Sequence, residues 1–302
     1  MEIINPCPRA VHPRGAVLAL GFFDGIHLGH RALFDEARRL AAEVSADVGV
    51  WTIDRPPRGG ECLTTEAEKA RLFTICGAAW AAADRFEDIR ALDGHTFFAQ
   101  LIAGRFAPAA VVCGFNFTFG AGASCHADDL ERFAREAGIP CSVCPAVEIG
   151  GLPVSSTRVR TLVRDGAMEE AARLLGGPYS FDLPVVHGLR LGHAIGHPTL
   201  NQRPPAEKLL PPRGVYASLV TADGKVYRGV SNLGSRPTVN ADAEDVTLET
   251  TVFGDPGELY GRTVSVGLAS FLRPERAFSS LAALEEQIGR DAEDARRFFD
   301  HH

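Results

Sequence analysis

Residues 17–30 read VLALGFFDGIHLGH, and this stretch decides the fold of the first half of the chain. Its first four residues form an apolar run that is typical of a buried parallel strand. After the stretch, Leu33, Ala37 and Leu40 recur at the spacing of one helix face. Residues 48–53 then form a second apolar run. The sequence therefore predicts a strand–helix–strand unit whose loop and helix start carry two histidines.

The same alternation continues to about residue 180. Residues 110–113 and the segment from Cys141 are further candidate strands, and a helix is expected at residues 127–136. This pattern predicts an α/β domain in which helices cover a parallel sheet. Such sheets bind ligands at the carboxyl ends of their strands, so we expect the chemistry of this half in the loops that follow the strands.

The pattern changes after about residue 183 to short strands separated by turn residues. The pair Asp223-Gly224 joins two strand-like segments and is typical of a tight hairpin turn. Evenly spaced antiparallel strands of this kind predict a small β-barrel. The expected strands are residues 215–220, 226–230, 247–252 and 263–271.

A closing helix is expected after the barrel strands, because Leu281, Leu284 and Ile288 form an apolar stripe. We expect this stripe to pack on the outside of the barrel. The two halves of the chain meet where a helical segment runs into Gly176-Gly177-Pro178, which predicts a domain boundary. The predicted domains are residues 1–180 and 181–302.

The composition limits the classes of protein to which the chain can belong. It has 302 residues, a net charge of −7 and 45% hydrophobic residues, as is ordinary for a globular protein of two domains. A negative chain without a stripe of Lys and Arg repels nucleic-acid phosphates, so a nucleic-acid partner is not expected. No apolar run approaches the roughly 20 residues that span a bilayer, and the N-terminus lacks a secretory signal. We expect a cytoplasmic protein without a membrane partner.

The seven cysteines are odd in number and all lie in the first half of the chain. They are expected to be free thiols in a reducing compartment. Cys141 and Cys144 have a spacing found in metal and redox sites, but the segment around them predicts a strand. Residues three apart on a strand point to opposite faces, so these two thiols are not expected to share a metal ion.

His27 and His30 lie at the predicted start of the first helix. Two imidazoles three residues apart on a helix project from one face, and the free amides of a helix start favour an anion. Together they can stabilise the charge that grows on a phosphate during nucleotidyl transfer. Gly25 and Gly29 would let the backbone and a base approach closely. The alternatives are two surface histidines at an ordinary helix start, or a zinc site for which no third ligand is suggested.

The flanking residues add a family resemblance. Residues 21–30, GFFDGIHLGH, resemble the signature of the nucleotidyltransferase superfamily and, in detail, that of bacterial FAD synthetases. Residues 154–160, VSSTRVR, resemble the second ATP-binding signature of that family, and residues 114–120, GFNFTFG, resemble its phenylalanine-rich loop. The resemblance implies a Rossmann-like domain in which His27 and His30 are catalytic. The residues that it implies in ATP binding are Gly25, Gly29, Asn116, Ser156, Thr157 and Arg160.

Two segments depart from the FAD synthetase pattern. Residues 53–57 read IDRPP, whereas the family commonly carries a histidine there. Residues 121–124 read AGAS, whereas the family usually carries basic residues there. Both departures bear on the rate of adenylyl transfer and on substrate affinity. They leave the two histidines and the Ser-Thr-Arg segment in place.

The second half resembles riboflavin kinase from about residue 185 to residue 297. The matching segments include residues 195–201, IGHPTLN, residues 232–239, NLGSRPTV, and residues 248–250, LET. Each segment alone is a weak signal, but their occurrence together is specific. The resemblance implies a small antiparallel β-barrel of the riboflavin kinase type with a closing helix.

The kinase resemblance implies a role for several polar residues. The Pro-Thr-x-Asn segment of the family supplies ligands for Mg-nucleotide, which transfers here to Thr199 and Asn201, and such hard oxygen atoms suit Mg²⁺. Glu249 matches the catalytic base that accepts the proton of the ribityl 5′-hydroxyl. The alternative for Glu249 is a solvated charge on the outer face of a strand. The residues implied in nucleotide or flavin binding are Gly188, Gly192, Gly196 and Asn201.

Three positions depart from the riboflavin kinase pattern. His193 stands where an arginine is usual, His197 where an aromatic residue is usual, and Thr251 where a histidine is common. These changes bear on nucleotide affinity. The threonine, asparagine and glutamate of the implied site are kept.

Together the resemblances cover almost the whole chain and imply a bifunctional riboflavin kinase/FMN adenylyltransferase of the bacterial type. Riboflavin and ATP would give FMN in the second half, and FMN and a second ATP would give FAD and pyrophosphate in the first. The implied cofactor is Mg²⁺, with ATP as co-substrate and FMN and FAD as products. Two alternatives stay open: a riboflavin kinase with weakened or lost adenylyltransferase activity, and a non-catalytic flavin-binding or flavin-sensing protein. The sequence does not predict an oligomeric state.

Overall fold

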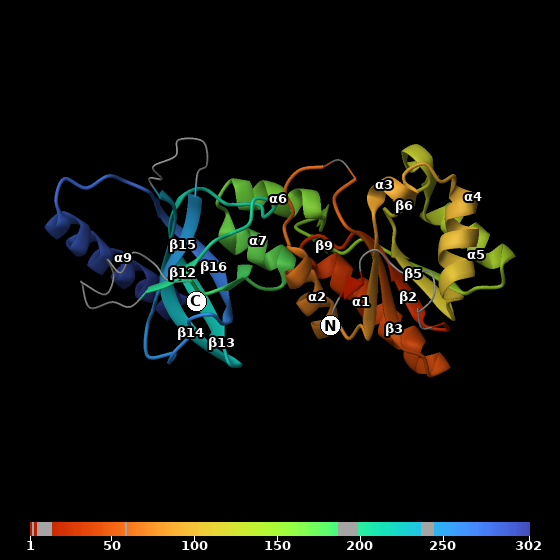
Figure 1. Cartoon of the computed structure of the whole chain (residues 1–302), viewed down its shortest axis with the longest axis horizontal. Helices are drawn as coiled ribbons and strands as arrows, with labels where there is room; N and C mark the ends of the chain where they lie inside the picture. The colour runs from red at the N-terminus through yellow and green to blue at the C-terminus, as the bar shows by residue number, and fades with distance from the viewer. Residues whose placement is uncertain (2, 5–13, 58, 187–198, 237–244) are drawn as a thin grey trace. The chain divides into compact units, whose positions relative to one another are not determined.

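The structure is a computed structural model of the whole chain, and it describes all residues except 2, 5–13, 58, 187–198 and 237–244 (Figure 1). Contacts between residues divide the chain into two compact units, Met1–Ser156 and Thr157–His302. Helices α6 (Ser156–Arg164) and α7 (Met168–Leu175) thus fall almost entirely in the second unit. The boundary that the sequence predicts at residue 180 remains a prediction about independent folding.

The first unit is built on a six-stranded sheet in which all neighbouring strands run parallel. The predicted strand–helix–strand unit is confirmed, because its two strands pair in register from Val17 opposite Val48 onward. Both strands are buried along their whole length, which explains their unbroken apolar sequence. In sheet order the strands are β1 (Ile3–Ile4), β4 (Trp80–Asp84), β3 (Val48–Ile53), β2 (Val17–Leu20), β5 (Ala110–Gly114) and β8 (Cys141–Cys144).

Helices cover both faces of this sheet (Figure 1). Leu33 and Phe34 of α1 (Leu28–Val44) and Phe73 of α2 (Glu66–Ile75) pack in one core cluster, on one face. The other face packs against π-helix η1 (Phe97–Gly104) and α5 (Ala127–Glu136). The α/β prediction is therefore confirmed. The remaining elements are α3 (Phe86–Ile89), α4 (Gly94–Thr96), β6 (Thr118–Phe119), η2 (Ala121–Ala123), β7 (Cys125–His126), β9 (Glu148–Ile149) and β10 (Leu152–Pro153).

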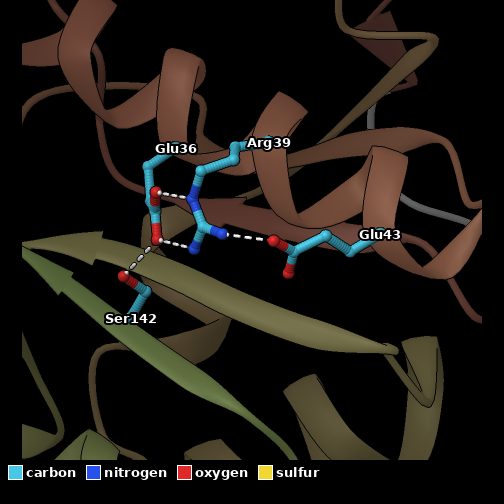
Figure 2. Close-up of polar contacts among 4 residues, drawn as sticks. All are labelled: Glu36, Arg39, Glu43 and Ser142. Atoms are coloured by element: carbon cyan, nitrogen blue, oxygen red, sulfur yellow. Dashed lines mark hydrogen bonds and ion pairs between the residues drawn. The ribbon is translucent and has the colours of Figure 1, made fainter.

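A polar network fixes α1 against the outermost strand β8 (Figure 2). Arg39 donates two hydrogen bonds to the carboxylate of Glu36, at 2.7 and 2.8 Å, and Ser142 of β8 donates a third at 2.9 Å. The bond from Arg39 is the main reason that the pKa of Glu36 lies below its usual value. Arg39 also pairs with Glu43 one turn further along the helix. Because Arg39 is more than half exposed, solvent screens these ion pairs and they add little to stability.

The two strand cysteines point to opposite faces, as predicted. Cys144 belongs to the core cluster beneath α1, whereas Cys141 packs with the cluster on the other face of the sheet. Burial raises the pKa of the Cys141 thiol to about 12 and that of Cys144 to about 11. Cys62, Cys76, Cys113, Cys125, Cys141 and Cys144, which are the cysteines that the structure describes, are all free thiols.

The second unit is a curled antiparallel sheet of six strands. Val186, just beyond the first edge strand, bridges Asn201 on the opposite edge strand, and Gln202 donates hydrogen bonds to Leu183 and Val264. These contacts join the two edges, so the predicted barrel is confirmed. In sheet order the strands are β11 (Tyr179–Pro184), β16 (Thr263–Pro274), β13 (Gly214–Ala222), β14 (Lys225–Arg236), β15 (Asp245–Val252) and β12 (Thr199–Gln202).

The predicted hairpin between β13 and β14 is present in register from Val215 to Ala222. Asp223 and Gly224 both have positive φ angles, 51° and 73°, as a primed two-residue turn requires. This geometry explains why Asp-Gly was an informative signal. Only glycine adopts such a φ without strain, and aspartate is one of the few residues that tolerates it.

The closing helix α9 (Leu281–His301) is present, but its buried stripe is shifted from the predicted one. Leu284 and Ile288 are only half-buried, whereas Gln287, Asp291 and Ala295 are buried. The shift arises because Arg273 of β16 donates two hydrogen bonds to Asp291, at 2.7 and 2.6 Å, and Gln287 donates one to the same carboxylate. Paired polar side chains thus form part of the buried face of the helix, for which only the apolar residues Leu281, Leu284 and Ile288 were expected.

Candidate active sites

The first candidate site is the turn between β2 and α1. His27 is the N-cap of α1, and its Nδ1 accepts the backbone N–H of His30 at 3.3 Å. The two imidazoles stack with ring centroids 3.7 Å apart, and the ring of Phe23 meets His30 edge-on. A Cβ at Gly29 would lie 3.2 Å from the His27 ring, so a side chain there would press on the stacked pair. The two histidines therefore form a stacked pair that packs against neighbouring side chains, and they are not two independent surface residues.

Burial makes both imidazoles neutral at neutral pH. Desolvation lowers the pKa of His27 to about 4, against an opposing effect of the nearby Asp24 carboxylate. The pKa of His30 lies well below 6.5, first because of burial and then because of the charges of His27 and Lys69. His30 also has a buried Nδ1 without a hydrogen-bond partner among the described residues. The pair can therefore donate hydrogen bonds without carrying a positive charge.

The turn that carries the histidines is strained. Phe23 and Ile26 have positive φ angles of 55° and 40°, which are unfavourable for residues with bulky side chains, and Gly25 has a φ of 86°. Such geometry persists only where surrounding contacts hold it, and it is common at functional sites. The buried carboxylate of Asp24 supplies one anchor, because it accepts the backbone N–H of both Leu63 and Thr64 at 3.1 Å.

The segment before and within α2 holds this turn and was not predicted to take part. Thr64 donates its hydroxyl to Asp24 and accepts the backbone N–H of Gly25. Lys69 of α2 donates a hydrogen bond to the carbonyl of Phe22 at 3.0 Å. The Thr65–Glu68 capping box that starts α2 was a local signal for this helix. The contacts themselves span about 40 residues of sequence, so no local pattern could reveal them.

The residues implied by the second ATP-binding signature lie at the start of α6. Ser156, the last residue of the first unit, donates its hydroxyl to the carbonyl of Asp24 at 2.8 Å, which joins this signature to the histidine turn. Thr157 and Arg160 follow on α6 within the second unit. Asn116 lies exposed in the turn that follows β5, at the carboxyl end of the parallel sheet.

The segments that depart from the FAD synthetase pattern are tied to neighbouring backbone and side chains. Asp54 accepts the backbone N–H of Phe86 at the start of α3. Arg55 forms an exposed ion pair with Glu87. Residues 121–123 form a short 3-10 turn without charged side chains. The structure thus provides no basic group at the second departure.

The second candidate site lies on three neighbouring strands of the barrel. Asn201 of β12 and Asn232 of β14 lie directly opposite Glu249 of β15, one on each side. Residues opposite each other in antiparallel strands project to the same face, so one carboxylate lies between two amide side chains. Thr199 lies two residues from Asn201 on that face, and the Asn201 amide nitrogen is 3.4 Å from the Thr199 hydroxyl. The structure therefore brings Thr199, Asn201 and Glu249 together.

Two further residues border this site and were not assigned a role from the sequence. Asn232 was part of a matching segment, but its position opposite Glu249 appears only in the folded sheet. A Cβ at Gly234 would lie 2.0 Å from a carboxylate oxygen of Glu275 and 3.0 Å from the amide nitrogen of Asn232. A side chain at position 234 would thus displace the ends of the Glu275 and Asn232 side chains. Gly188, Gly192 and Gly196, together with His193 and His197, lie outside the described residues.

The donor set of the second site consists of oxygen atoms. A threonine hydroxyl, an asparagine amide and a glutamate carboxylate are the kinds of ligand that suit Mg²⁺. Within the described part of the chain, no group of three or more His, Cys, Asp or Glu could hold a metal ion by itself. The residues therefore fit a metal that shares its coordination with water and substrate phosphates. None of the described helices is long and apolar enough to cross a membrane.

Comparisons with known proteins find relatives for both halves of the chain. The FAD synthetase family profile matches residues 10–158, and the riboflavin kinase family profile matches residues 175–299. The bifunctional riboflavin kinase/FMN adenylyltransferase of Escherichia coli (strain K12) is 34% identical over 294 residues, which cover 94% of this chain and 93% of that protein. The protein of the same name from Bacillus subtilis (strain 168) is 32% identical, over 94% of this chain and 92% of that protein.

A solved structure described as a macrolide-efflux protein from Streptococcus pneumoniae has the same fold over nearly the full length. Its TM-score is 0.81 at 30% sequence identity, and the match covers 95% of each chain. The two family profiles cover both units in the order in which the two candidate sites occur. The chain belongs to the bifunctional riboflavin kinase/FMN adenylyltransferase family.

Proposed function

We propose that the chain makes FAD from riboflavin in two steps at its two sites. The second unit transfers the γ-phosphate of ATP to riboflavin and gives FMN. The first unit transfers the adenylyl group of a second ATP to FMN and gives FAD and pyrophosphate. The proposal is supported by the stacked pair of His27 and His30 in the first unit and by Glu249 opposite Asn201 in the second. It is also supported by the family to which the chain belongs.

In the first site we propose that His27 donates a hydrogen bond to the ATP phosphates. Its Nδ1 accepts the backbone N–H of His30, so in the neutral ring the proton resides on Nε2. A neutral Nε2–H group can stabilise the charge that grows on the phosphates, and burial strengthens that interaction. His30 stacks on this ring and fixes its orientation. We assign Gly25, Gly29, Asn116, Ser156, Thr157 and Arg160 to the binding of ATP.

In the second site we propose that Glu249 accepts the proton of the riboflavin 5′-hydroxyl during phosphoryl transfer. Asn201 and Asn232 lie opposite Glu249 on the two adjacent strands, where an amide can donate a hydrogen bond to a carboxylate. Thr199 and Asn201 would hold Mg²⁺, which neutralises the phosphates of ATP when it is bound. We assign Gly188, Gly192 and Gly196 to the binding of nucleotide or flavin.

The location that we propose is the cytoplasm. The cysteines that the structure describes are free thiols, which is typical of proteins in a reducing compartment. Both proposed reactions consume ATP, and the cytoplasm supplies it.

The test is to incubate the purified chain with riboflavin, ATP and Mg²⁺ and to separate the flavins by chromatography. We expect FMN first and then FAD. A double variant with His27→Ala and His30→Ala should still convert riboflavin to FMN but should make no FAD from supplied FMN. Glu249→Gln should show the opposite pattern.

Each unfavourable result identifies a different error. FMN without FAD in the wild type would show that the departures at residues 53–57 and 121–124 have cost the chain its adenylyltransferase activity. No turnover of ATP with either flavin would favour a flavin-binding protein. Equal loss of both activities in a folded double variant would contradict the assignment of the histidines to one of the two steps.

A further inference from the structure

Lys69 is a buried lysine directly beside the histidine turn. Its side chain is on α2, only 5% of the residue is exposed, and its ammonium nitrogen lies 3.0 Å from the carbonyl oxygen of Phe22. The same nitrogen lies 3.7 Å from the centre of the Phe22 ring. Lysine is rarely buried because its charge loses hydration, so a buried lysine requires compensating contacts. Here the carbonyl dipole and the aromatic face supply them.

The carbonyl that Lys69 contacts is the point at which the turn begins. Thr52 of β3 donates its hydroxyl to the same oxygen at 3.1 Å, so the Phe22 carbonyl is fixed by two donors from two elements. The next residue is Phe23, whose φ of 55° is strained. Because a strained turn keeps its geometry only through surrounding contacts, these donors hold the orientation of the histidines that follow.

The positive charge of Lys69 lies near the histidine pair that is proposed to bind the phosphates of ATP. The stacked histidines are neutral at neutral pH, whereas ATP carries several negative charges. Residues 121–124, where the family usually has basic side chains, provide none. Lys69 is close enough to His30 for its charge to help lower the pKa of that imidazole. A positive charge is thus present beside the neutral histidine pair.

The acidic groups around the turn are occupied by backbone amides. Asp24 accepts the N–H groups of Leu63 and Thr64, and Glu68 accepts that of Thr65 in the capping box of α2. Among the titratable groups, His30 is affected by the charge of Lys69, and Glu68 is the neighbour of Lys69 on α2.

We infer that Lys69 is a positioning residue for adenylyl transfer, which fixes the Phe22 carbonyl and places a positive charge beside the histidine pair. This inference rests on the proposed adenylyltransferase activity of the first unit. A lysine that only fills space would be replaceable by an apolar side chain of the same length. A positioning lysine requires both the donor and the charge.

The test compares three substitutions in the full chain. Lys69→Met keeps the length but removes donor and charge, Lys69→Gln keeps a donor without charge, and Lys69→Arg keeps both. The matched control is Arg71→Met, which removes a positive charge from the exposed side of the same helix. The measurements are kcat and KM for ATP in FAD formation from FMN, as a function of pH. The fluorescence of Trp51 and Trp80, which both lie in the first unit, reports whether that unit is folded in each variant, and kinase turnover reports on the second unit.

We expect Lys69→Met to lower kcat/KM for ATP by roughly 10²-fold, because even a small misplacement of the groups that bind the substrate has an effect of that size. The kcat/KM of Lys69→Gln should lie between that of Lys69→Met and that of wild type. The kcat/KM of Lys69→Arg should stay within about tenfold of the wild-type value. The acid limb of the pH profile should move to higher pH in Lys69→Met and Lys69→Gln. Both variants remove a positive charge that lowers the pKa of His30. A purely structural role would not move this limb. Arg71→Met should resemble wild type in rate and pH profile.

Three results would overturn the inference: Lys69→Met with wild-type kinetics and pH profile, Lys69→Arg as impaired as Lys69→Met, or an unchanged acid limb in Lys69→Gln. If Lys69→Met does not fold, the comparison of Gln with Arg decides by the same criteria. These outcomes differ from failure of the proposed function itself, because in that case wild type would make no FAD from FMN.

Discussion

Glu249 lies opposite an asparagine on each of the two adjacent strands, and its proposed role there is that of the base. Glu249→Gln keeps the size of the side chain and can still form hydrogen bonds, but it cannot accept a proton. We expect kinase turnover to fall by roughly 10²- to 10⁴-fold while the binding of riboflavin and ATP is largely kept. FAD formation from supplied FMN should not change. Near wild-type kinase turnover at saturating substrates would show that Glu249 is not the base.

Thr199→Ala is the informative comparison, because the hydroxyl that it removes is a proposed ligand of Mg²⁺. This variant should raise KM for ATP as well as lower turnover, and added Mg²⁺ should restore part of the loss. Glu249→Gln should not respond to Mg²⁺. If both variants respond to added Mg²⁺ in the same way, the assignment of Glu249 as base and Thr199 as metal ligand is wrong.

His27 makes the stability of the first unit depend on pH. Its pKa is about 4 in the folded chain, against 6.5 for a fully hydrated histidine, so the unfolded state binds the proton more readily. The contribution of the neutral ring is complete above pH 6.5 and is lost as pH falls from 6.5 to 4, by up to about 3 kcal/mol. Denaturant unfolding of wild type and His27→Gln at about pH 5 and pH 7.5 measures this difference.

The variant should lose less stability on acidification than wild type does. His95→Gln changes an exposed histidine of the same unit and is the control. Its loss of stability between pH 7.5 and pH 5 should equal that of wild type. The same pH dependence in wild type and His27→Gln would mean that His27 is hydrated in solution. It would then also weaken the proposal that a neutral imidazole acts in the first site.

At the scale of elements, α9 is held to the barrel by a buried ion pair. Arg273 is one-fifth exposed and Asp291 less than one-tenth, and two hydrogen bonds join them. Asp291→Asn leaves the arginine without its counter-charge, and we expect a loss of about 3 kcal/mol in the free energy of unfolding of the second unit. Asp300→Asn removes an exposed partner of Arg228 from the same helix and should cost less than about 1 kcal/mol.

Thermal or denaturant unfolding with a probe for the second unit measures both variants, and FAD formation from FMN reports on the first unit. Equal losses in the two variants would show that burial does not strengthen the Arg273–Asp291 pair. The same result would make the apolar contacts of Ala295 and Phe299 the main attachment of the helix.

The elements that the sequence predicted are those with a strong local pattern. The apolar runs of β2 and β3, the helical spacing within α1 and the Asp-Gly turn all carry their signal within a few residues. Strand β4 was missed, because Trp80–Asp84 is mostly alanine and has no β-branched residue. The stripe of α9 was displaced, because Gln287 and Asp291 are buried beside Arg273, which precedes the helix on β16.

In the candidate sites, too, contacts between sequence neighbours could be predicted and contacts between distant residues could not. His27 and His30, or Thr199 and Asn201, are neighbours in sequence, so their association could be predicted. The contacts of Asp24 with Thr64 and of Lys69 with Phe22 span about 40 residues, and only the folded sheet brings them together. The pairing of Asn232 with Glu249 likewise depends on strand register.

At the scale of the whole molecule, the question is where the kinase unit begins. The sequence predicts residue 181, whereas contacts place the division at residue 157. Met168 and Leu174 of α7 are buried, and this helix packs on β16. The family profiles leave residues 159–174 unmatched, so they do not decide between the two boundaries.

We therefore expect a fragment of residues 157–302 to fold and to phosphorylate riboflavin, and a fragment of residues 181–302 to be clearly less stable. The shorter fragment loses α7 and also Tyr179, which pairs with Leu268 of β16 and donates its hydroxyl to the carbonyl of Leu209. Unfolding of the two fragments and their kinase turnover test this expectation. Equal stability and turnover would place the boundary at residue 181, and α6 and α7 would then serve as a connection between the two units. A folded fragment of residues 157–302 that binds riboflavin and ATP without turnover would instead contradict the assignment of the kinase to the second unit.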